Sequence, residues 1–246
     1  MKKISKLFGI LGVASVFALT SCNLTIINSG GKDTTKTGDA PQTTDNYNYT
    51  ADDANYIVDS NTYNSAINYV SADDVTVHSY SYNYEKKPEN LYIELKFEKD
   101  GNNIKATTST KIGLNTNEST TYYVIIDDNN VKQFTLGENN AYVESKLSVD
   151  YDKLISTSYL NDLYASLTFD SKTNTYKVED YEAVFPVGDK TVKQKIDLEL
   201  KFENKKLVSI DATMDLNGYV SVHSIEIAYG NSAFVLPAEI EAALQK

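Results

Sequence analysis

The segment Leu91-Tyr92-Ile93-Glu94-Leu95-Lys96-Phe97-Glu98 decides the fold class of this 246-residue chain. Its odd-numbered residues are apolar, and its even-numbered residues are amphipathic or charged. Because successive side chains of a β-strand point to opposite faces, this alternation is typical of an antiparallel strand with one buried face. The polar segment 99–103 then predicts a turn, and 104–112 returns as the second strand of a hairpin.

A near-repeat of this segment occurs in the second half of the chain. Leu198-Glu199-Leu200-Lys201-Phe202-Glu203 closely matches Ile93-Glu94-Leu95-Lys96-Phe97-Glu98, and a polar turn follows each of them. Antiparallel strands converge on such alternation, so both convergence and a duplicated hairpin remain open. Similar patterns predict further strands at 122–126, 131–136, 142–147, 167–169, 175–185, 193–203, 207–216 and 218–229.

Three segments have the pattern of short helices. The apolar residues of the first are spaced by three and four positions after a possible cap at Thr62: Tyr63, Ala66, Ile67 and Val70. Helical spacing also relates the apolar residues that follow Asp152: Ile155, Tyr159, Leu160, Leu163, Tyr164 and Leu167. Pro237 is suited to open a terminal helix that ends near residue 244. The order of elements predicts an α+β fold, a large curved antiparallel sheet of half-barrel type with an N-terminal, a central and a C-terminal helix.

The start of the chain has the pattern of a secretory signal. Lys2, Lys3 and Lys6 precede an apolar run, 7–19, that is shorter than the ~20 residues a membrane-spanning helix needs. The run ends in Leu19-Thr20-Ser21-Cys22, which contains the only cysteine of the chain. This stretch resembles the bacterial lipoprotein box, and the resemblance implies cleavage before Cys22 and lipid attachment to its thiol. The alternative is an ordinary secreted protein with a free thiol at Cys22.

These patterns divide the chain into three expected parts. Residues 1–21 are the signal peptide. Residues 22–58 are rich in Thr, Asn, Asp, Gly and Ser, so they are expected to be a lipidated N-terminus and a disordered tether. Residues 59–246 are expected to form a single antiparallel-sheet domain, held by its lipids on the extracytoplasmic side of the cell membrane.

The charge of the chain excludes one class of partner. The formal net charge is −11, and removal of the signal segment takes away three lysines and no acid, which leaves −14. Such a surface repels nucleic acid, so no nucleic-acid partner is expected. The chain also contains no arginine, and therefore no guanidinium for bidentate binding of phosphate or carboxylate.

The domain resembles a group of envelope proteins, the LolA-like and LppX-like half-barrel lipoproteins. The resemblance rests on the order of elements, on the lipid anchor, and on two phrases before Leu236-Pro237: Phe202-Glu203-Asn204-Lys205-Lys206-Leu207 and Ile225-Glu226-Ile227-Ala228-Tyr229. It implies a diffuse apolar lining that holds a lipid. No ligand-binding residue can be transferred from that group, because its members share no short binding motif that matches this chain.

The search for catalytic chemistry gives no candidate. The chain has no Gly-x-Ser-x-Gly, no phosphate-binding glycine loop and no His-Glu-x-x-His, so no enzyme activity, catalytic residue, cofactor or metal is expected. Its two histidines, His78 and His223, lie in predicted strands and have no spaced partner ligands. Among its 19 tyrosines, alternation places Tyr80, Tyr82 and Tyr84 on one strand face, which makes this row the best candidate for a contact surface.

Two functions therefore remain open. The first is a non-catalytic binding module whose concave sheet holds an apolar or amphipathic ligand, such as a lipid, in a cavity between sheet and helices. The second is a surface-exposed structural or interaction lipoprotein that contacts a protein or glycan partner through an outer patch. The sequence does not predict the oligomeric state or the identity of the ligand.

Overall fold

The structure of the chain, a computed structural model, describes residues 41–245 except for 46, 48, 51, 72–73, 113, 128–129, 148–154, 156, 158–159, 162, 188–189, 217 and 231. The side chains of 112, 183–187, 190–192 and 216 are not described either. The expected signal peptide, Cys22 and the first part of the expected tether thus lie outside the described residues.

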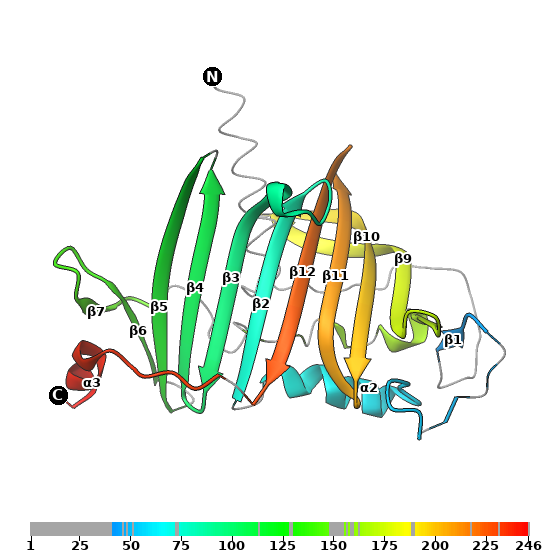
Figure 1. The fold of residues 1–246 in the computed structure, drawn as a ribbon, viewed down its shortest axis with the longest axis horizontal. Coiled ribbons are helices and arrows are strands. Elements are labelled where there is room, and N and C mark those ends of the chain that lie inside the picture. The colour runs from blue at the N-terminus through cyan, green and yellow to red at the C-terminus, as the bar shows by residue number, and fades with distance from the viewer. Residues whose placement is uncertain are drawn as a thin grey trace.

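Within the described residues, twelve strands form one open sheet that curves across the molecule (Figure 1). Their order is β1-β8-β9-β10-β11-β12-β2-β3-β4-β5-β6-β7, and all neighbours are antiparallel except β1 and β8. The strands are β1 (Gln42–Thr43), β2 (Asp74–Asn83), β3 (Leu91–Asp100), β4 (Asn103–Ile112), β5 (Asn115–Asp127), β6 (Asn130–Leu136), β7 (Tyr142–Ser145), β8 (Thr168–Asp170), β9 (Thr175–Val187), β10 (Lys190–Glu203), β11 (Lys206–Leu216) and β12 (Tyr219–Tyr229). Two runs of consecutive strands, β2 to β7 and β8 to β12, therefore meet where β12 pairs with β2.

The hairpin turns agree with their residue types. Between β10 and β11, Asn204 and Lys205 both have positive φ, 50° and 63°, as a two-residue hairpin turn with the twist of the strands requires. Between β3 and β4, Gly101 has a φ of 54°. The predicted hairpin of 91–98 and 104–112 is therefore present, and so is the one built on its near-repeat.

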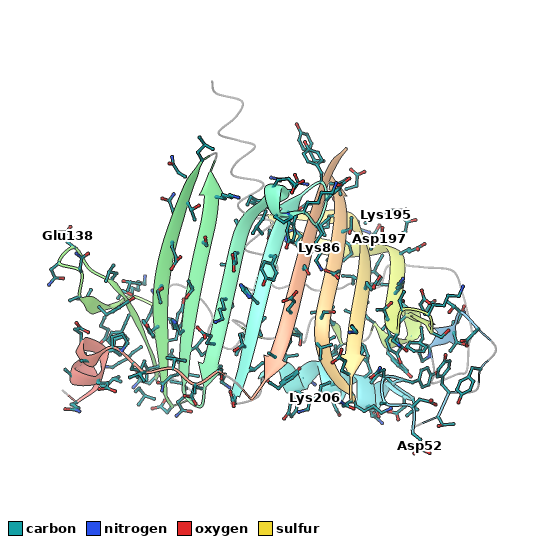
Figure 2. All side chains as sticks on the ribbon, viewed as in Figure 1. Asp52, Lys86, Glu138, Lys195, Asp197 and Lys206 are labelled. Carbon is teal, nitrogen blue, oxygen red and sulfur yellow. The ribbon has the colours of Figure 1, made fainter. Side chains whose placement is uncertain are left out.

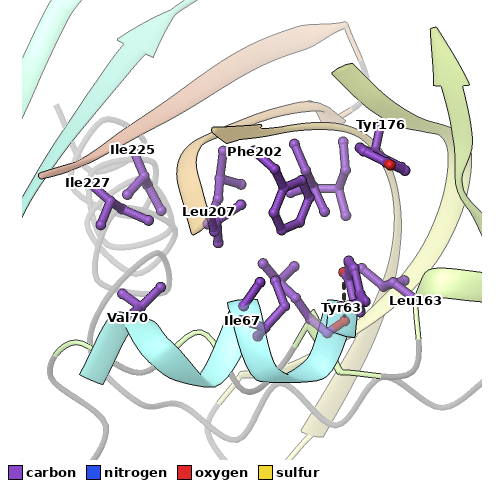
Figure 3. Close-up of a cluster of buried hydrophobic side chains, with 14 of the residues drawn as sticks. Tyr63, Ile67, Val70, Leu163, Tyr176, Phe202, Leu207, Ile225 and Ile227 are labelled. Carbon is purple, nitrogen blue, oxygen red and sulfur yellow. Dashed lines mark hydrogen bonds between the residues drawn. The ribbon is translucent and has the colours of Figure 1, made fainter. Parts of the chain in front are cut away.

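One face of the sheet packs on α2 (Ser60–Asn68), and we call it the covered face (Figure 3). Tyr63 and Ile67 of α2 are fully buried against Phe202 and Leu207 of the sheet. Asp59 caps α2, since its Oδ1 accepts a hydrogen bond of 2.7 Å from the backbone N–H of Thr62. The predicted N-terminal helix is thus present, but its cap is Asp59 and not Thr62.

The second helix, α3 (Ala238–Leu244), packs on the opposite side of the sheet near its β7 end (Figure 1). Its buried residue Ile240 joins a small apolar cluster with Tyr122, Val124 and Phe134. Tyr122 and Val124 alternate along β5 with Tyr123, which points to the covered face. The predicted C-terminal helix is present, with Pro237 as the residue that precedes it.

The predicted central helix is not found at the described residues of its span. Ile155 lies in a turn, and Tyr164–Ser166 forms a single 3₁₀ turn. The apolar residues there are nevertheless buried, since Leu160 and Leu163 are at most 1% exposed. Irregular chain can bury the same side chains as a helix, so the apolar spacing alone did not determine the backbone.

Part of the segment expected to be a tether belongs to the fold. Gln42–Thr43 pairs with β8, and Ile57 is fully buried. The backbone N–H of Ile57 donates to the Tyr176 hydroxyl at 2.6 Å, and its carbonyl accepts from the Tyr164 hydroxyl at 2.6 Å. Lys205 donates to the carbonyls of Asp53 and Tyr56. The folded part therefore begins before residue 59.

Candidate functional site

The face of the sheet opposite α2, which we call the outer face, is turned toward the viewer in Figure 1. No described helix lies across the middle of its central strands, β3, β2, β12 and β11, while the segment 84–90 with the 3₁₀ turn Pro88–Asn90 lies at their upper end (Figure 1). Figure 2 shows Lys86 at one end of this region and Lys206 near α2 at the other end. The middle of the outer face is thus a surface on which a partner molecule could lie against the sheet.

Three aromatic side chains form a row on this face at the pairing of β2 with β12. His78, Tyr80 and Tyr82 occupy alternate positions of β2, and we call them the aromatic ladder. The ring centroids of His78 and Tyr80 are 4.3 Å apart, and those of Tyr80 and Tyr82 are 6.3 Å apart. The structure therefore brings together two of the three tyrosines that the sequence pattern selected.

A chain of hydrogen bonds fixes the lower part of the ladder. His78 Nε2 lies 2.6 Å from Oε1 of Glu94 on β3, and His78 Nδ1 lies 2.8 Å from the Tyr80 hydroxyl. A neutral imidazole with its proton on Nε2 satisfies both contacts, since it donates to Glu94 and accepts from Tyr80. The Tyr80 hydroxyl is then used as a donor within the protein, and the ring is held in one orientation.

The environment of Tyr80 disfavours its ionisation. Partial burial, followed by the negative charges of Glu226 and Glu94, raises the pKa of Tyr80 to about 12. The hydroxyl of Tyr80 is therefore held in its protonated form, as a hydrogen-bond donor to His78.

Cross-strand pairing determines which groups flank the ladder. Tyr80 lies opposite Glu94 on β3 and Ser224 on β12, and His78 lies opposite Glu226 on β12. Glu226 is exposed and has no cationic partner among the described residues. Ser224 is 1% exposed, and its hydroxyl has no hydrogen-bond partner within the part of the chain that the structure describes.

The sequence pattern predicted that Tyr84 continues the row on β2, but the structure places Tyr84 outside it. It follows the last residue of the strand and has a φ of 67°. Its backbone N–H donates to the carbonyl of Val220 at 2.8 Å, and its ring lies 6.4 Å from that of Tyr219 at the start of β12. Tyr84 and Tyr219 are 54% and 50% exposed and form a second aromatic pair at the end of β2 and β12. Tyr219 alternates along β12 with Ser221 and His223 of the covered face, so this pair is not part of the aromatic ladder on the outer face.

The two histidines lie on opposite faces of the sheet, so they cannot share a metal ion. His223 is on the covered face, 3% exposed, and its ring nitrogens lie 3.0 Å from the hydroxyls of Ser81 and Ser221. Burial lowers its pKa to about 4, because the charged form would lose its hydration. No group of three or more metal-ligating side chains occurs among the residues that the structure describes.

The covered face is polar where it extends beyond α2. Ser79, Ser81, Ser221 and His223 are all buried there. The hydroxyl of Tyr92 lies beside Ser81 and Ser221, and burial raises the pKa of Tyr92. An apolar cavity would need an apolar lining, so this part of the covered face is poorly suited to a lipid tail.

A shallow hollow of about 630 Å³ lies beside the C-terminal end of α2. Lys206 Nζ lies 4.6 Å from the ring centre of Tyr69 and 5.1 Å from that of Tyr229. Asn68, Ser71 and Asp74 complete most of its rim. The two rings already surround the only cation of the hollow's described lining, so this hollow is a weaker candidate than the outer face.

Comparison with known proteins adds no assignment, since no family model and no curated protein matches the chain. Within the described residues, no helix has the length and apolar character needed to cross a bilayer. The lipid-attachment residue predicted from the sequence, Cys22, lies outside the described residues.

Sequence reasoning missed two features of the outer face. It gave His78 no role beside the tyrosines, although alternation alone places His78 on their face of the strand. It also missed Glu94 and Glu226, whose positions depend on the register of β3 and β12 against β2. Register between segments distant in sequence had no local signal in this chain.

Proposed function

We propose that this chain is a cell-envelope lipoprotein that binds a protein or glycan partner through its outer face and performs no chemistry on it. The observation that carries the proposal is the row of aromatic side chains along the seam of β2 and β12. Tyr80 and Tyr82 are half-buried there, and the ring of His78 lies beside that of Tyr80. Tyrosines provide large amphipathic contact area with little loss of side-chain entropy, which suits a binding surface.

The raised pKa of Tyr80 supports the non-catalytic part of the proposal. Its hydroxyl stays protonated although it donates a hydrogen bond to His78. The sequence supplies no catalytic motif elsewhere. An open sheet face also leaves a reacting bond in water, whereas enzymes exclude water from that bond.

The location follows from the lipoprotein box at Leu19-Thr20-Ser21-Cys22. We propose that acyl chains on Cys22 hold the domain at the extracytoplasmic side of the cell membrane. The segment between Cys22 and β1 then spaces the sheet from the bilayer, so that the outer face meets material of the envelope.

A second candidate function is the half-barrel carrier that the LolA-like and LppX-like resemblance suggests. One observation favours it, because Ile93, Leu95 and Ile125 are only half-buried on the covered face. The polar cluster around His223 on the same face argues against this alternative, because a lipid tail needs an apolar lining. In this alternative, a lipid would lie against the covered face, and the outer face would have no role.

Co-sedimentation of the full-length chain with isolated envelope fragments tests the proposal. We expect the chain, solubilised in a polyoxyethylene detergent, to sediment with the fragments, and Tyr82→Ala to reduce the bound fraction at least about fivefold. Tyr69→Ala is the matched control, since Tyr69 is an exposed tyrosine beside the covered face. Equal sedimentation of both variants and the unaltered chain would contradict the proposal. A bound lipid extracted from the purified chain would favour the second candidate.

A further inference from the structure

We infer that the ligand of the outer face is an uncharged saccharide chain that lies along the seam of β2 and β12. The inference depends on the proposed function and narrows its partner to one chemical class. It rests on three observations: the pairing of the nearby lysines, the free acceptor beside the ladder, and the length of the aromatic row.

The lysines beside the ladder are not available for an anionic ligand. Lys86 Nζ lies 3.0 Å from a carboxylate oxygen of Asp211. Lys96 and Lys105 lie 2.9 Å and 3.3 Å from the two carboxylate oxygens of Glu98. An anionic ligand would have to break one of these pairs, and the chain contains no arginine to compensate. It would also face the negative charges that already raise the pKa of Tyr80.

An acceptor without a donor is available at the same place. The carboxylate of Glu226 is exposed and has no cationic partner within the described residues, and an ionised carboxylate can only accept hydrogen bonds. The hydroxyl groups of a sugar can donate hydrogen bonds to such an acceptor, and they add no charge to the site.

The aromatic row has the shape of a site for a chain. From His78 to Tyr82 the extended backbone of β2 advances about 13 Å, at ~3.3 Å per residue. Aromatic side chains lie at both ends and in the middle of this span, with ring centroids 4.3 Å apart for His78 and Tyr80 and 6.3 Å apart for Tyr80 and Tyr82. Each pyranose ring has an apolar side of C–H groups, which packs on aromatic side chains, and a rim of hydroxyls. Several sugar units in succession would match a row of this length.

A peptide strand fits this face less well. Both edges of β2 and of β12 are already paired with neighbouring strands, so a peptide could not add to the sheet at the seam. Its backbone amides would then need other partners when they are removed from water. Protein interfaces also have cores depleted of charged residues, whereas ion pairs and carboxylates surround this row.

Isothermal titration calorimetry of the full-length chain in a polyoxyethylene detergent tests the inference. The probes are neutral hexasaccharides of glucose, mannose, xylose and N-acetylglucosamine, together with an anionic galacturonate hexamer and a cationic glucosamine hexamer. We expect at least one neutral hexasaccharide to bind. We expect the matching disaccharide to bind at least about tenfold more weakly, because it contacts only part of the row.

Variants locate the site and separate its parts. Tyr82→Ala should weaken binding about tenfold, and Glu226→Gln about fivefold. Tyr82→Phe should stay within about twofold, since it keeps the ring and reports on correct folding. Glu239→Gln on α3 and Tyr69→Ala are the matched controls and should leave binding unchanged.

Failure of the inference differs from failure of the proposed function. If no neutral saccharide binds, or if a charged hexamer binds more tightly than every neutral one, the inference is wrong. The proposed function still stands in that case if Tyr82→Ala reduces sedimentation with envelope fragments. If Tyr82→Ala leaves that sedimentation unchanged, the proposed function is wrong as well.

Discussion

The hydroxyl of Tyr80 lies 2.8 Å from Nδ1 of His78, and both side chains project from the outer face of β2. Because Glu94 lies 2.6 Å from the other ring nitrogen, carboxylate, imidazole and phenol form one connected chain across β2 and β3. The hydrogen bond occupies the Tyr80 hydroxyl. A partner on this face would therefore contact the ring of Tyr80 more than its hydroxyl.

The variant Tyr80→Phe separates these two parts of the side chain. It keeps the ring and removes the donor to His78, so we expect binding to envelope fragments to stay within about twofold. The free energy of unfolding should fall by about 0.5–1.5 kcal/mol, the usual net contribution of one such hydrogen bond. Urea titration and co-sedimentation measure the two effects. A large loss of binding with no loss of stability would mean that the hydroxyl contacts the partner directly.

Burial of neutral His223 predicts that stability depends on pH. Its pKa is about 4 in the folded chain and about 6.5 when unfolded, so the unfolded state binds more protons between these values. Stability from this group is present above pH 6.5 and is lost as the pH falls toward 4, by about 3 kcal/mol in total. Urea titrations at pH 7 and pH 4.5 should show a smaller loss for His223→Gln than for the unaltered chain. Equal losses would contradict the buried neutral state.

The packing of α2 on the sheet predicts a large effect at Phe202. This ring is fully buried, and its centroid lies 5.8 Å from that of Tyr63 and 5.4 Å from that of Tyr176. Phe202→Ala should lower the free energy of unfolding by about 3–5 kcal/mol, through lost transfer energy and the cavity left behind. Leu136→Ala, at a site 55% exposed, should change it by about 0.5 kcal/mol or less. Similar values for both in urea titrations would contradict the described core.

Lipid attachment at Cys22 predicts where the protein is found in the cell. Cys22→Ser removes the thiol that carries the acyl chains, so the protein should lose its stable anchoring by those chains. Metabolic labelling with a fatty acid should mark the unaltered chain and leave Cys22→Ser unlabelled. Label on both chains, or on neither, would contradict attachment at this residue.

Much of the sheet could be predicted because its strands alternate strictly. The segment 91–98 has this pattern, and the strand found there is Leu91–Asp100. The prediction of a central helix was wrong at its described residues. Leu160 and Leu163 are buried although the chain there forms turns, and the spacing of apolar residues cannot distinguish such a chain from a helix. Tyr56 and Ile57 are buried without belonging to any helical or strand period, so the sequence pattern did not predict their place in the core.

The candidate site was predictable only where one strand determines it. Alternation along β2 was sufficient to place Tyr80 and Tyr82 together. Glu94 and Glu226 reach the ladder through the registers of β3 and β12, which depend on the whole sheet. Tyr84 lies outside the row because the strand ends before it and its φ is positive. A tyrosine rarely adopts a positive φ, so the residue type did not predict this backbone conformation.

Carboxylate footprinting of the full-length chain on envelope fragments tests the central claim most directly. Carbodiimide labelling followed by mass spectrometry would be compared with and without the fragments. The account predicts that Glu226 and Glu94 on the outer face become protected, whereas Glu239 and Glu241 on α3 stay equally labelled. Unchanged labelling of Glu226 and Glu94 while the chain is bound would contradict a partner on the outer face.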